Sequence, residues 1–256
     1  MREGRFLNYV VKATAGQLGF RLSAEELWLS RRAVIRAGLF SNDLSLLPEA
    51  VSLSPGTTKD EILAGLGLQA EEVDSAFTAP FDPRAQNAVA ALSQAILQTP
   101  ELREKVINYS AVLRRNLLSG LQKQIDLAQA TDVFVMDLGY AATIQTVLTR
   151  ILAREGALIK LRGLYLSLND RAAANVAKGA DVQAYLDHEG FRGPTAALLS
   201  RTPDVLEHAS MCREGSLADY DEAGRPVLLP NQRDETQLLQ METVQAGISA
   251  GVEAVN

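Results

Sequence analysis

The middle of the chain constrains its fold more than any other part of the sequence. Residues 131–138 form an apolar run in which Val133–Met136 are consecutive, which predicts a strand covered on both faces. Gly139 ends this run, and residues 141–155 then repeat apolar side chains at helical spacing. A second apolar run at 157–168 predicts another strand. Strand, helix and strand in this order predict a βαβ unit with parallel strands and a right-handed crossover.

The rest of the chain favours one large α/β domain over residues 1–256. The 256 residues are 47% hydrophobic and 22% charged, which is typical of a globular protein with a sizeable core. Residues 84–129 are helical in pattern almost throughout and predict a helical lobe within this domain. Its apolar stripe predicts a packing face, made of Leu102, Val106, Tyr109, Leu113 and Leu117.

Local signals predict further elements along the chain. Apolar periodicity, turn residues and capping residues carry these predictions, for example the pair Thr58 and Glu61 at the start of a helix. The predicted elements are helices at 4–18, 33–40 and 58–64, strands at 26–30 and 50–53, short helices at 181–188 and 195–199, a hairpin of 216–220 with 226–229, and a final helix at 234–252.

Composition excludes several classes of protein. With 25 basic and 31 acidic residues, the net charge of −6 makes a nucleic-acid partner a poor fit. Cys212 is the only cysteine, and His188 and His208 are the only histidines, so an intrachain disulfide, a thiolate cluster and a multi-histidine zinc site are excluded. No apolar stretch approaches the ~20 residues of a transmembrane helix, and the N-terminus lacks the apolar segment of a signal peptide. We therefore expect a cytoplasmic protein without a transmembrane segment.

The end of the first predicted strand is a candidate phosphate site. Ligands of open parallel sheets bind beyond the carboxyl ends of the strands. There Asp137 is followed by Gly139 and small residues that lead into a helix near Thr143, so backbone N–H groups can meet a phosphate. Asp137 would accept hydrogen bonds from sugar hydroxyls or help to hold Mg²⁺. The alternative is that Asp137 and Thr143 only cap the helix.

Two other groups of residues are candidates for chemistry. Ser30 precedes Arg31 and Arg32 at the end of another predicted strand, and paired guanidinium groups suit phosphate recognition. The alternative for this pair is a solvated helix start. Glu207 and His208 offer an acid–base pair, although a single histidine is more often structural.

Taken together, these motifs resemble a known bacterial family. The matching segments are Trp28–Arg32, Val135–Gln145, the stretch from Gly163, Leu206–Glu207 and Gly215–Tyr220. The family is a module that accompanies HAD-type phosphatase domains and glycosyltransferases in surface-polysaccharide gene clusters, and the resemblance covers about residues 5 to 250.

The resemblance implies a fold and an activity. The fold would be a Rossmann-like parallel-sheet core, similar to type I phosphoribosyltransferases, with a helical lobe and a C-terminal hairpin plus long helix. The activity would be Mg²⁺-dependent transfer of 5-phosphoribose from PRPP to a glycan hydroxyl in ribofuranose-containing O-antigen (lipopolysaccharide) or capsule assembly, with pyrophosphate leaving. A HAD-type phosphatase partner would then remove the phosphate.

The resemblance also implies roles for particular residues. Asp137 would bind the ribose hydroxyls and the metal, Glu207 would activate or orient the acceptor, and Arg31 and Arg32 would bind pyrophosphate. The remaining substrate-binding residues would be Ser30, Gly139, Tyr140, Ala141, Ala142, Thr143 and Gln145. The sequence departs from the family motif because its usual pair of acids is reduced to Met136–Asp137 and its loop is one residue shorter.

Two other functions fit the same residues. A sugar-phosphate hydrolase or a nucleotide-sugar transferase could use the loop for another phosphate. A non-catalytic scaffold could instead dock a phosphatase or glycosyltransferase partner through its acidic helices.

Overall fold

A computed structural model describes residues 4–53, 58–77, 81–82, 85–127, 130–186 and 203–254. Contacts group the chain into two compact units, and each is treated by itself. The first unit comprises Met1–Ser30, Leu121–Ala218 and Pro226–Asn256, and the second comprises Arg31–Gly120 and Asp219–Arg225. The organisation as a single domain stays a prediction.

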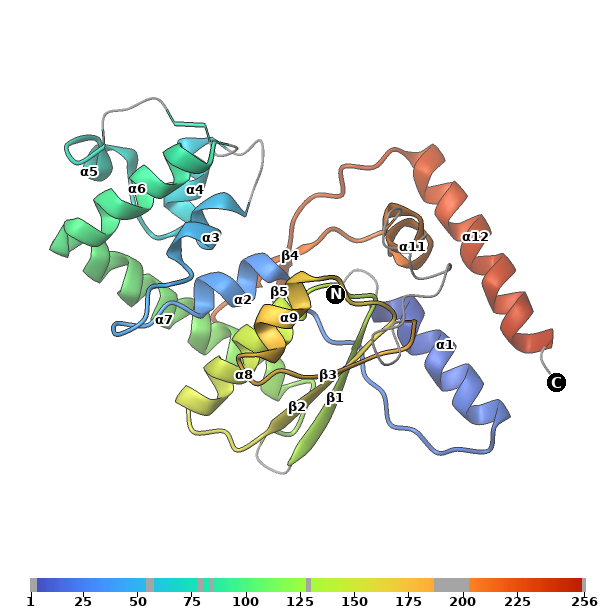
Figure 1. Cartoon of the computed structure of the whole chain (residues 1–256). Helices are drawn as coiled ribbons and strands as arrows, with labels where there is room; N and C mark the ends of the chain where they lie inside the picture. Colours follow the sequence, from blue (N-terminus) through green and yellow to red (C-terminus); the bar gives the residue numbers. More distant parts are fainter. Residues whose placement is uncertain are drawn as a thin grey trace. The chain divides into compact units, whose positions relative to one another are not determined.

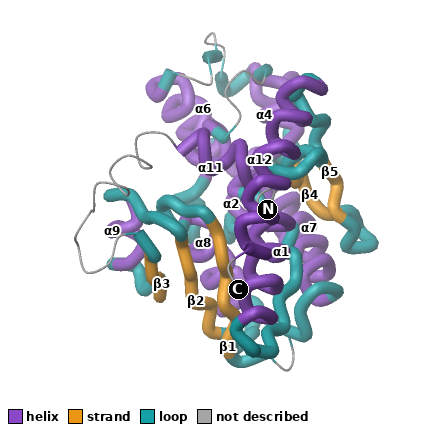
Figure 2. The backbone as a smooth tube through the Cα atoms, turned by 90° about the vertical axis from the view of Figure 1, so that its right-hand side faces the viewer, coloured by secondary structure: helices purple, strands orange, loops and turns teal. Residues whose placement is uncertain are grey.

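The first unit contains the predicted βαβ arrangement. Its strands β1 (Asp132–Asp137), β2 (Lys160–Tyr165) and β3 (Asp181–Ala184) form a sheet in the order β1-β2-β3. Both pairings are parallel, and Figure 2 shows the three strands side by side. Helix α8 (Thr143–Arg154) connects β1 to β2, and α9 (Arg171–Val176) lies between β2 and β3. The mixed α/β class and the βαβ unit are therefore confirmed, while a full Rossmann-like core stays a prediction.

The third strand corrects a sequence prediction. Residues 181–188 were expected to form a helix, but Asp181–Ala184 pairs with Arg162–Tyr165 of β2. The segment is too short to show a clear helical or strand period. It becomes a strand because the second edge of β2 offers backbone N–H and C=O groups with which it can pair. The end of that predicted helix, and the whole of the one at 195–199, lie outside the described residues.

Strand β1 is covered on one face only, which contradicts the expected burial on both. Val135 is buried, whereas Phe134 and Met136 are 60% and 40% exposed. Side chains alternate along a strand, so these two residues share the face opposite Val135. That open face lies beside α1 (Gly4–Gln17), which packs against β1 (Figure 2).

Three helices pack together elsewhere in the first unit. Helix α11 (Pro203–Ser210) contacts α1 and α12 (Glu235–Ala254), and α1 also contacts α12 (Figure 1). Both α1 and α12 confirm the predicted helices at 4–18 and 234–252. A small buried cluster supports this packing, formed by Met211, Leu238 and Met241.

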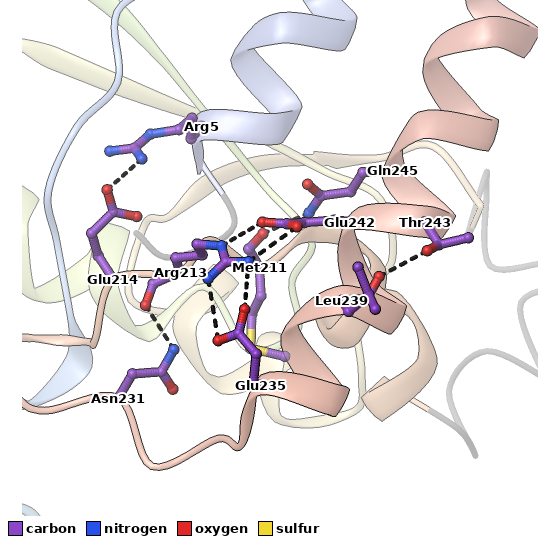
Figure 3. A network of polar contacts seen from close by, with 10 residues as sticks. All are labelled: Arg5, Met211, Arg213, Glu214, Asn231, Glu235, Leu239, Glu242, Thr243 and Gln245. Carbon is purple, nitrogen blue, oxygen red and sulfur yellow. Dashed lines mark hydrogen bonds and ion pairs between the residues drawn. The ribbon is translucent and has the colours of Figure 1, made fainter.

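A polar network holds the segment after α11 against its neighbours (Figure 3). Arg213 makes hydrogen-bonded ion pairs with Glu235 at 3.0 Å and with Glu242 at 2.5 Å, both on α12. Arg5 of α1 donates to Glu214 at 2.5 Å. The ion pairs with Arg213 lower the pKa of Glu242, while Arg213 itself is about half exposed.

The predicted hairpin is also confirmed. Strands β4 (Leu217–Tyr220) and β5 (Pro226–Leu228) form a two-stranded sheet. The N–H of Asp221 donates to the carbonyl of Arg225 at 3.0 Å and closes the turn.

In its described residues the second unit is built mainly of helices. They are α2 (Arg31–Ala37), α3 (Leu47–Ser52), α4 (Lys59–Gly65), α5 (Ala70–Asp74), α6 (Gln86–Gln98) and α7 (Pro100–Gln122). The Thr58–Glu61 capping box at the start of α4 is confirmed, and so is burial of the α7 stripe at Leu102, Val106, Leu113 and Leu117.

Two predicted strands are wrong. Residues 50–53 belong largely to α3, where Pro48 stands in the first turn and Leu47, Ala50 and Val51 are buried. Residues 26–30 form neither strand nor helix. The N–H of Trp28 donates to the Gln124 side chain at 3.3 Å, so a side chain stands where a neighbouring strand would have to pair.

Arg114 of α7 closes the end of α2. Its guanidinium donates to the carbonyls of Ala37 at 2.9 Å and Leu39 at 3.1 Å and lies 4.1 Å from the centre of the Phe40 ring. The final carbonyls of a helix need external donors, and Arg114 supplies them from α7. Among the residues described, no helix is both long and apolar enough to cross a membrane.

Candidate functional site

Asp137 lies where the sequence places it, at the carboxyl end of β1. Its side chain is half-buried, and Oδ1 accepts a hydrogen bond from the N–H of Leu138 at 2.8 Å. Asp137 is paired in register with Tyr165 of β2. Burial, and then the negative charge of Asp137, raise the pKa of the Tyr165 phenol. The carboxylate therefore stands at the tip of the sheet beside a neutral tyrosine.

The carbonyl groups of the loop after Asp137 accept hydrogen bonds from neighbouring residues of the protein. The carbonyls of Leu138, Tyr140 and Ala141 accept from Ser167 N–H at 3.1 Å, Asn169 N–H at 2.8 Å and the Asn175 side chain at 2.6 Å. Within the described part of the chain, nothing accepts from the N–H groups of Gly139, Ala141, Ala142 and Thr143. These four donors are the groups that a ligand can use.

The start of α8 adds to this set of donors. Ala142 is the N-cap residue with φ of +58°, and no side chain caps the helix. The capping alternative is thus wrong for Asp137 and Thr143, since Thr143 is itself the first helical residue. An uncapped N-terminus carries partial positive charge and unpaired N–H groups, which favours an anion such as phosphate.

Gly139 is required by the shape of this loop. Its φ of +144° disfavours any side chain, and a Cβ atom there would overlap the carbonyl oxygen of Ser167. We expect Gly139→Val to lower the free energy of unfolding by roughly 2–4 kcal/mol, because backbone strain and a backbone clash act together. Urea unfolding monitored by circular dichroism measures this change.

Gly156→Val is the matched control for Gly139→Val. Gly156 also has a positive φ, +81°, but a Cβ atom there would meet open space. We expect it to cost about 1–2 kcal/mol from strain alone. If both variants lost the same free energy of unfolding, the clash of a Cβ atom at position 139 with the carbonyl of Ser167 would make no contribution.

Gln145 was expected to bind substrate, but its carboxamide is engaged within the sheet. The side chain is buried, and Nε2 donates to the carbonyls of Leu161 at 3.1 Å and Asp181 at 2.8 Å. Oε1 accepts from the Tyr165 hydroxyl at 2.9 Å. Gly163 makes room for it, because a Cβ atom there would overlap Gln145 Oε1. These contacts join α8 to β2 and β3, and a role toward substrate stays a prediction.

The paired arginines lie in the first turn of α2. Arg31 is exposed, Arg32 is half-buried, and Ser30 is the half-buried residue before the helix. The expectation that they follow a strand is wrong, because residues 26–30 form no strand. Arg31 and Arg32 belong to the second unit, whereas Asp137 and its loop belong to the first.

The sequence analysis missed a buried ion pair next to these arginines. Arg36 of α2 is only 7% exposed and donates to Asp219 at 3.0 Å and to the carbonyl of Gly65 at 3.1 Å. Burial raises the pKa of the Asp219 carboxyl and lowers that of Arg36. The motif Gly215–Tyr220 was noticed in the sequence, but its partner is 183 residues away, and no local signal connects them.

The remaining candidates are on or near α11. Glu207 and His208 are half-buried there, and α11 packs against α1 and α12. Cys212 is buried, and burial raises the pKa of its thiol to about 11. That thiol is almost fully protonated at neutral pH, so Cys212 is a poor nucleophile.

The described residues contain no cluster of side chains that could hold Mg²⁺ without a substrate. No group of three or more His, Cys, Asp or Glu residues suited to a metal ion occurs among them. Mg²⁺ commonly binds through one or two carboxylates, with water and substrate phosphates as its other ligands. Asp137 fits this arrangement if the ion arrives with a diphosphate.

No protein-family model matches the chain, and no curated protein is significantly similar to it. The fold and the site define an α/β protein in which a loop with unpaired N–H groups joins a parallel strand to an uncapped helix, an arrangement that suits an anion.

Proposed function

We propose that this protein transfers 5-phosphoribose from PRPP to a hydroxyl group of a glycan and releases pyrophosphate. The observation that carries the proposal is the loop directly after Asp137, in which the unpaired N–H groups of Gly139 and Ala141–Thr143 lead into the uncapped N-terminus of α8. This is the arrangement that a sugar phosphate requires, with donors for its phosphate and a carboxylate for its hydroxyls. The resemblance to modules of surface-polysaccharide synthesis supplies the choice of PRPP, of the glycan acceptor and of a HAD-type phosphatase partner.

Each part of the site has a role in this reaction. The anomeric carbon becomes oxocarbenium-like as the bond to pyrophosphate breaks, so the ribose has to be held while the negative charge departs. The loop N–H groups would hold the 5-phosphate, and Asp137 would accept hydrogen bonds from the ribose hydroxyls. Mg²⁺ would neutralise the diphosphate, with Asp137 as its protein ligand. Glu207 is the proposed residue for orienting the acceptor.

A titration with ribose 5-phosphate tests the loop directly. Backbone ¹H–¹⁵N spectra should show the largest shifts at Gly139–Thr143, and ribose without phosphate should leave these signals in place. Phosphate binding at any other group of amides would contradict the proposal. Phosphate release from sugar phosphates without PRPP consumption would favour a hydrolase, and failure to bind either ligand would favour a scaffold.

Arg31 and Arg32 are tested separately through pyrophosphate. We expect Arg31→Ala and Arg32→Ala to weaken PRPP binding by roughly tenfold or more each, because hydrogen bonds to charged groups contribute about 1.5–3 kcal/mol. Binding of ribose 5-phosphate should change little. Calorimetric titration with both ligands measures the difference, and Arg115→Ala on exposed α7 surface is the control. Equal losses for both ligands would assign the two arginines another role.

A further inference from the structure

Gln145 is the third residue of α8, and its side chain turns into the sheet instead of toward the start of its own helix. The helix begins at Thr143, and Gln145 is 1% exposed. Nε2 uses both of its hydrogens on the carbonyls of Leu161 and Asp181, and Oε1 accepts from the hydroxyl of Tyr165. The carboxamide therefore has no hydrogen left to donate to a substrate, and its effect on one has to pass through the backbone.

The residue in the corresponding position caps three other helices of the described chain. A Glu or Gln at the third helical position can accept from the N–H of the residue that precedes the helix, which is half of a capping box. In α4, Glu61 accepts in this way from Thr58 at 2.9 Å, and α5 has the same bond at 3.0 Å. In α12, Gln237 accepts from the N–H of Asp234 at 3.3 Å. A glutamine at this position is thus able to occupy the N–H that precedes a helix.

The same N–H is left open in α8. Ala142 precedes the helix, and within the described part of the chain nothing accepts from its N–H. A carboxamide oxygen at this N–H would remove one donor from the loop and set an acceptor against a phosphate. Two features hold the oxygen of Gln145 elsewhere. The Tyr165 hydroxyl donates to it at 2.9 Å, and Gly163 leaves room for it, because a Cβ atom there would overlap it.

We propose that Gln145 is a positioning residue, held by Tyr165 and the sheet so that the N–H of Ala142 stays free for the phosphate of a substrate. It acts without touching that substrate. The inference rests on the proposed function, since that function assigns the loop to a sugar phosphate. It deepens the proposed function because it explains why no described side chain caps α8, whereas α4, α5 and α12 are capped from the same position.

Gln145→Glu tests whether the open N–H depends on the amide group. A carboxylate cannot donate to the two sheet carbonyls, so it should turn and accept from the Ala142 N–H, as Glu61 does at the start of α4. The ¹H–¹⁵N signal of Ala142 should then shift downfield before any ligand is added. Ribose 5-phosphate should bind at least tenfold more weakly at pH 7 in a calorimetric titration, because a donor to a charged group is lost. Unchanged affinity, or weaker binding with the Ala142 signal in place, would overturn the proposal.

Gln237→Glu is the matched control for the added charge. It makes the same change at the same position of α12, where the side chain already caps its helix. Binding of ribose 5-phosphate should stay within about twofold of wild type. A loss as large as that of Gln145→Glu would mean that the charge of the protein acts, and would also overturn the proposal.

Tyr165→Phe releases the oxygen while Gln145 stays in place, and it decides the matter if Gln145→Glu does not fold. We expect binding about threefold weaker and an Ala142 signal shifted in the same direction, because the freed oxygen reaches the N–H part of the time. Adding Gln145→Met should restore binding, since methionine has nearly the same length and cannot cap. A structural role alone predicts that the double variant binds more weakly still, and that result would refute the proposal.

The Ala142 signal separates this inference from the proposed function, because it is measured without ligand. Wild-type protein that binds ribose 5-phosphate at Gly139–Thr143, with neither affinity nor signal changed in the variants, would overturn this inference and leave the proposed function standing. Wild-type protein that does not bind ribose 5-phosphate at this loop would overturn both.

Discussion

Replacing Asp137 with asparagine is expected to abolish measurable phosphoribosyl transfer while the protein stays folded. Asparagine keeps the shape of the side chain and the Oδ1 that accepts from Leu138 N–H. It loses the negative charge that would face the ribose hydroxyls and Mg²⁺. Removing one electrostatic group of this kind costs roughly 100- to 1,000-fold in rate. PRPP consumption measures the loss, and thermal unfolding checks the fold.

Asp181→Asn is the matched control for Asp137→Asn. Asp181 begins β3 in the same sheet, and its exposed carboxylate pairs with Lys160 at 3.1 Å. The change is chemically identical but lies away from the carboxyl end of β1, so activity should be retained. Near-normal PRPP consumption by Asp137→Asn would reduce Asp137 to a structural residue and remove the proposed site.

Truncating Asp219 to alanine is expected to destabilise the second unit by about 3–5 kcal/mol. Arg36 would keep its bond to Gly65 but lose its carboxylate partner while 7% exposed. An uncompensated buried charge costs far more than the net contribution of the pair. The midpoint of urea unfolding should therefore fall sharply.

A double variant separates the lost pair from the unpaired charge. Arg36→Met combined with Asp219→Leu removes both charges and fills the space with apolar groups, so it should recover most of the stability. A loss below 1 kcal/mol for Asp219→Ala would mean that water reaches Arg36. No recovery in the double variant would mean that packing, not charge, dominates this position.

Long periodic segments were predictable because their signal is local. The βαβ unit, α7 and α12 each show their period within the segment itself, and the Thr58–Glu61 capping box needs only four residues. Three short segments without such turn or capping residues were not predictable. Residues 26–30, 50–53 and 181–184 are apolar or mixed runs whose state depends on whether a strand edge is available to pair with them.

The candidate site also has a part that the sequence predicts and a part that it does not. Asp137 and the loop that follows it could be found from a strand run, a glycine and a helix start, because a ligand site at a strand end follows from chain order. The hydrogen bonds of Gln145 could not be predicted from the sequence, because the carbonyls that accept them belong to β2 and β3, which follow later in the chain.

The sequence by itself determined the parallel βαβ unit, the long helices and the position of Asp137 at a strand end, because periodicity and turn residues act between near neighbours. Only the tertiary structure decided that β3 is a strand, that one face of β1 stays open, and that Arg36 pairs with Asp219. Pairing, burial and ion pairs join residues distant in the chain, and their free energy exists only after the segments meet.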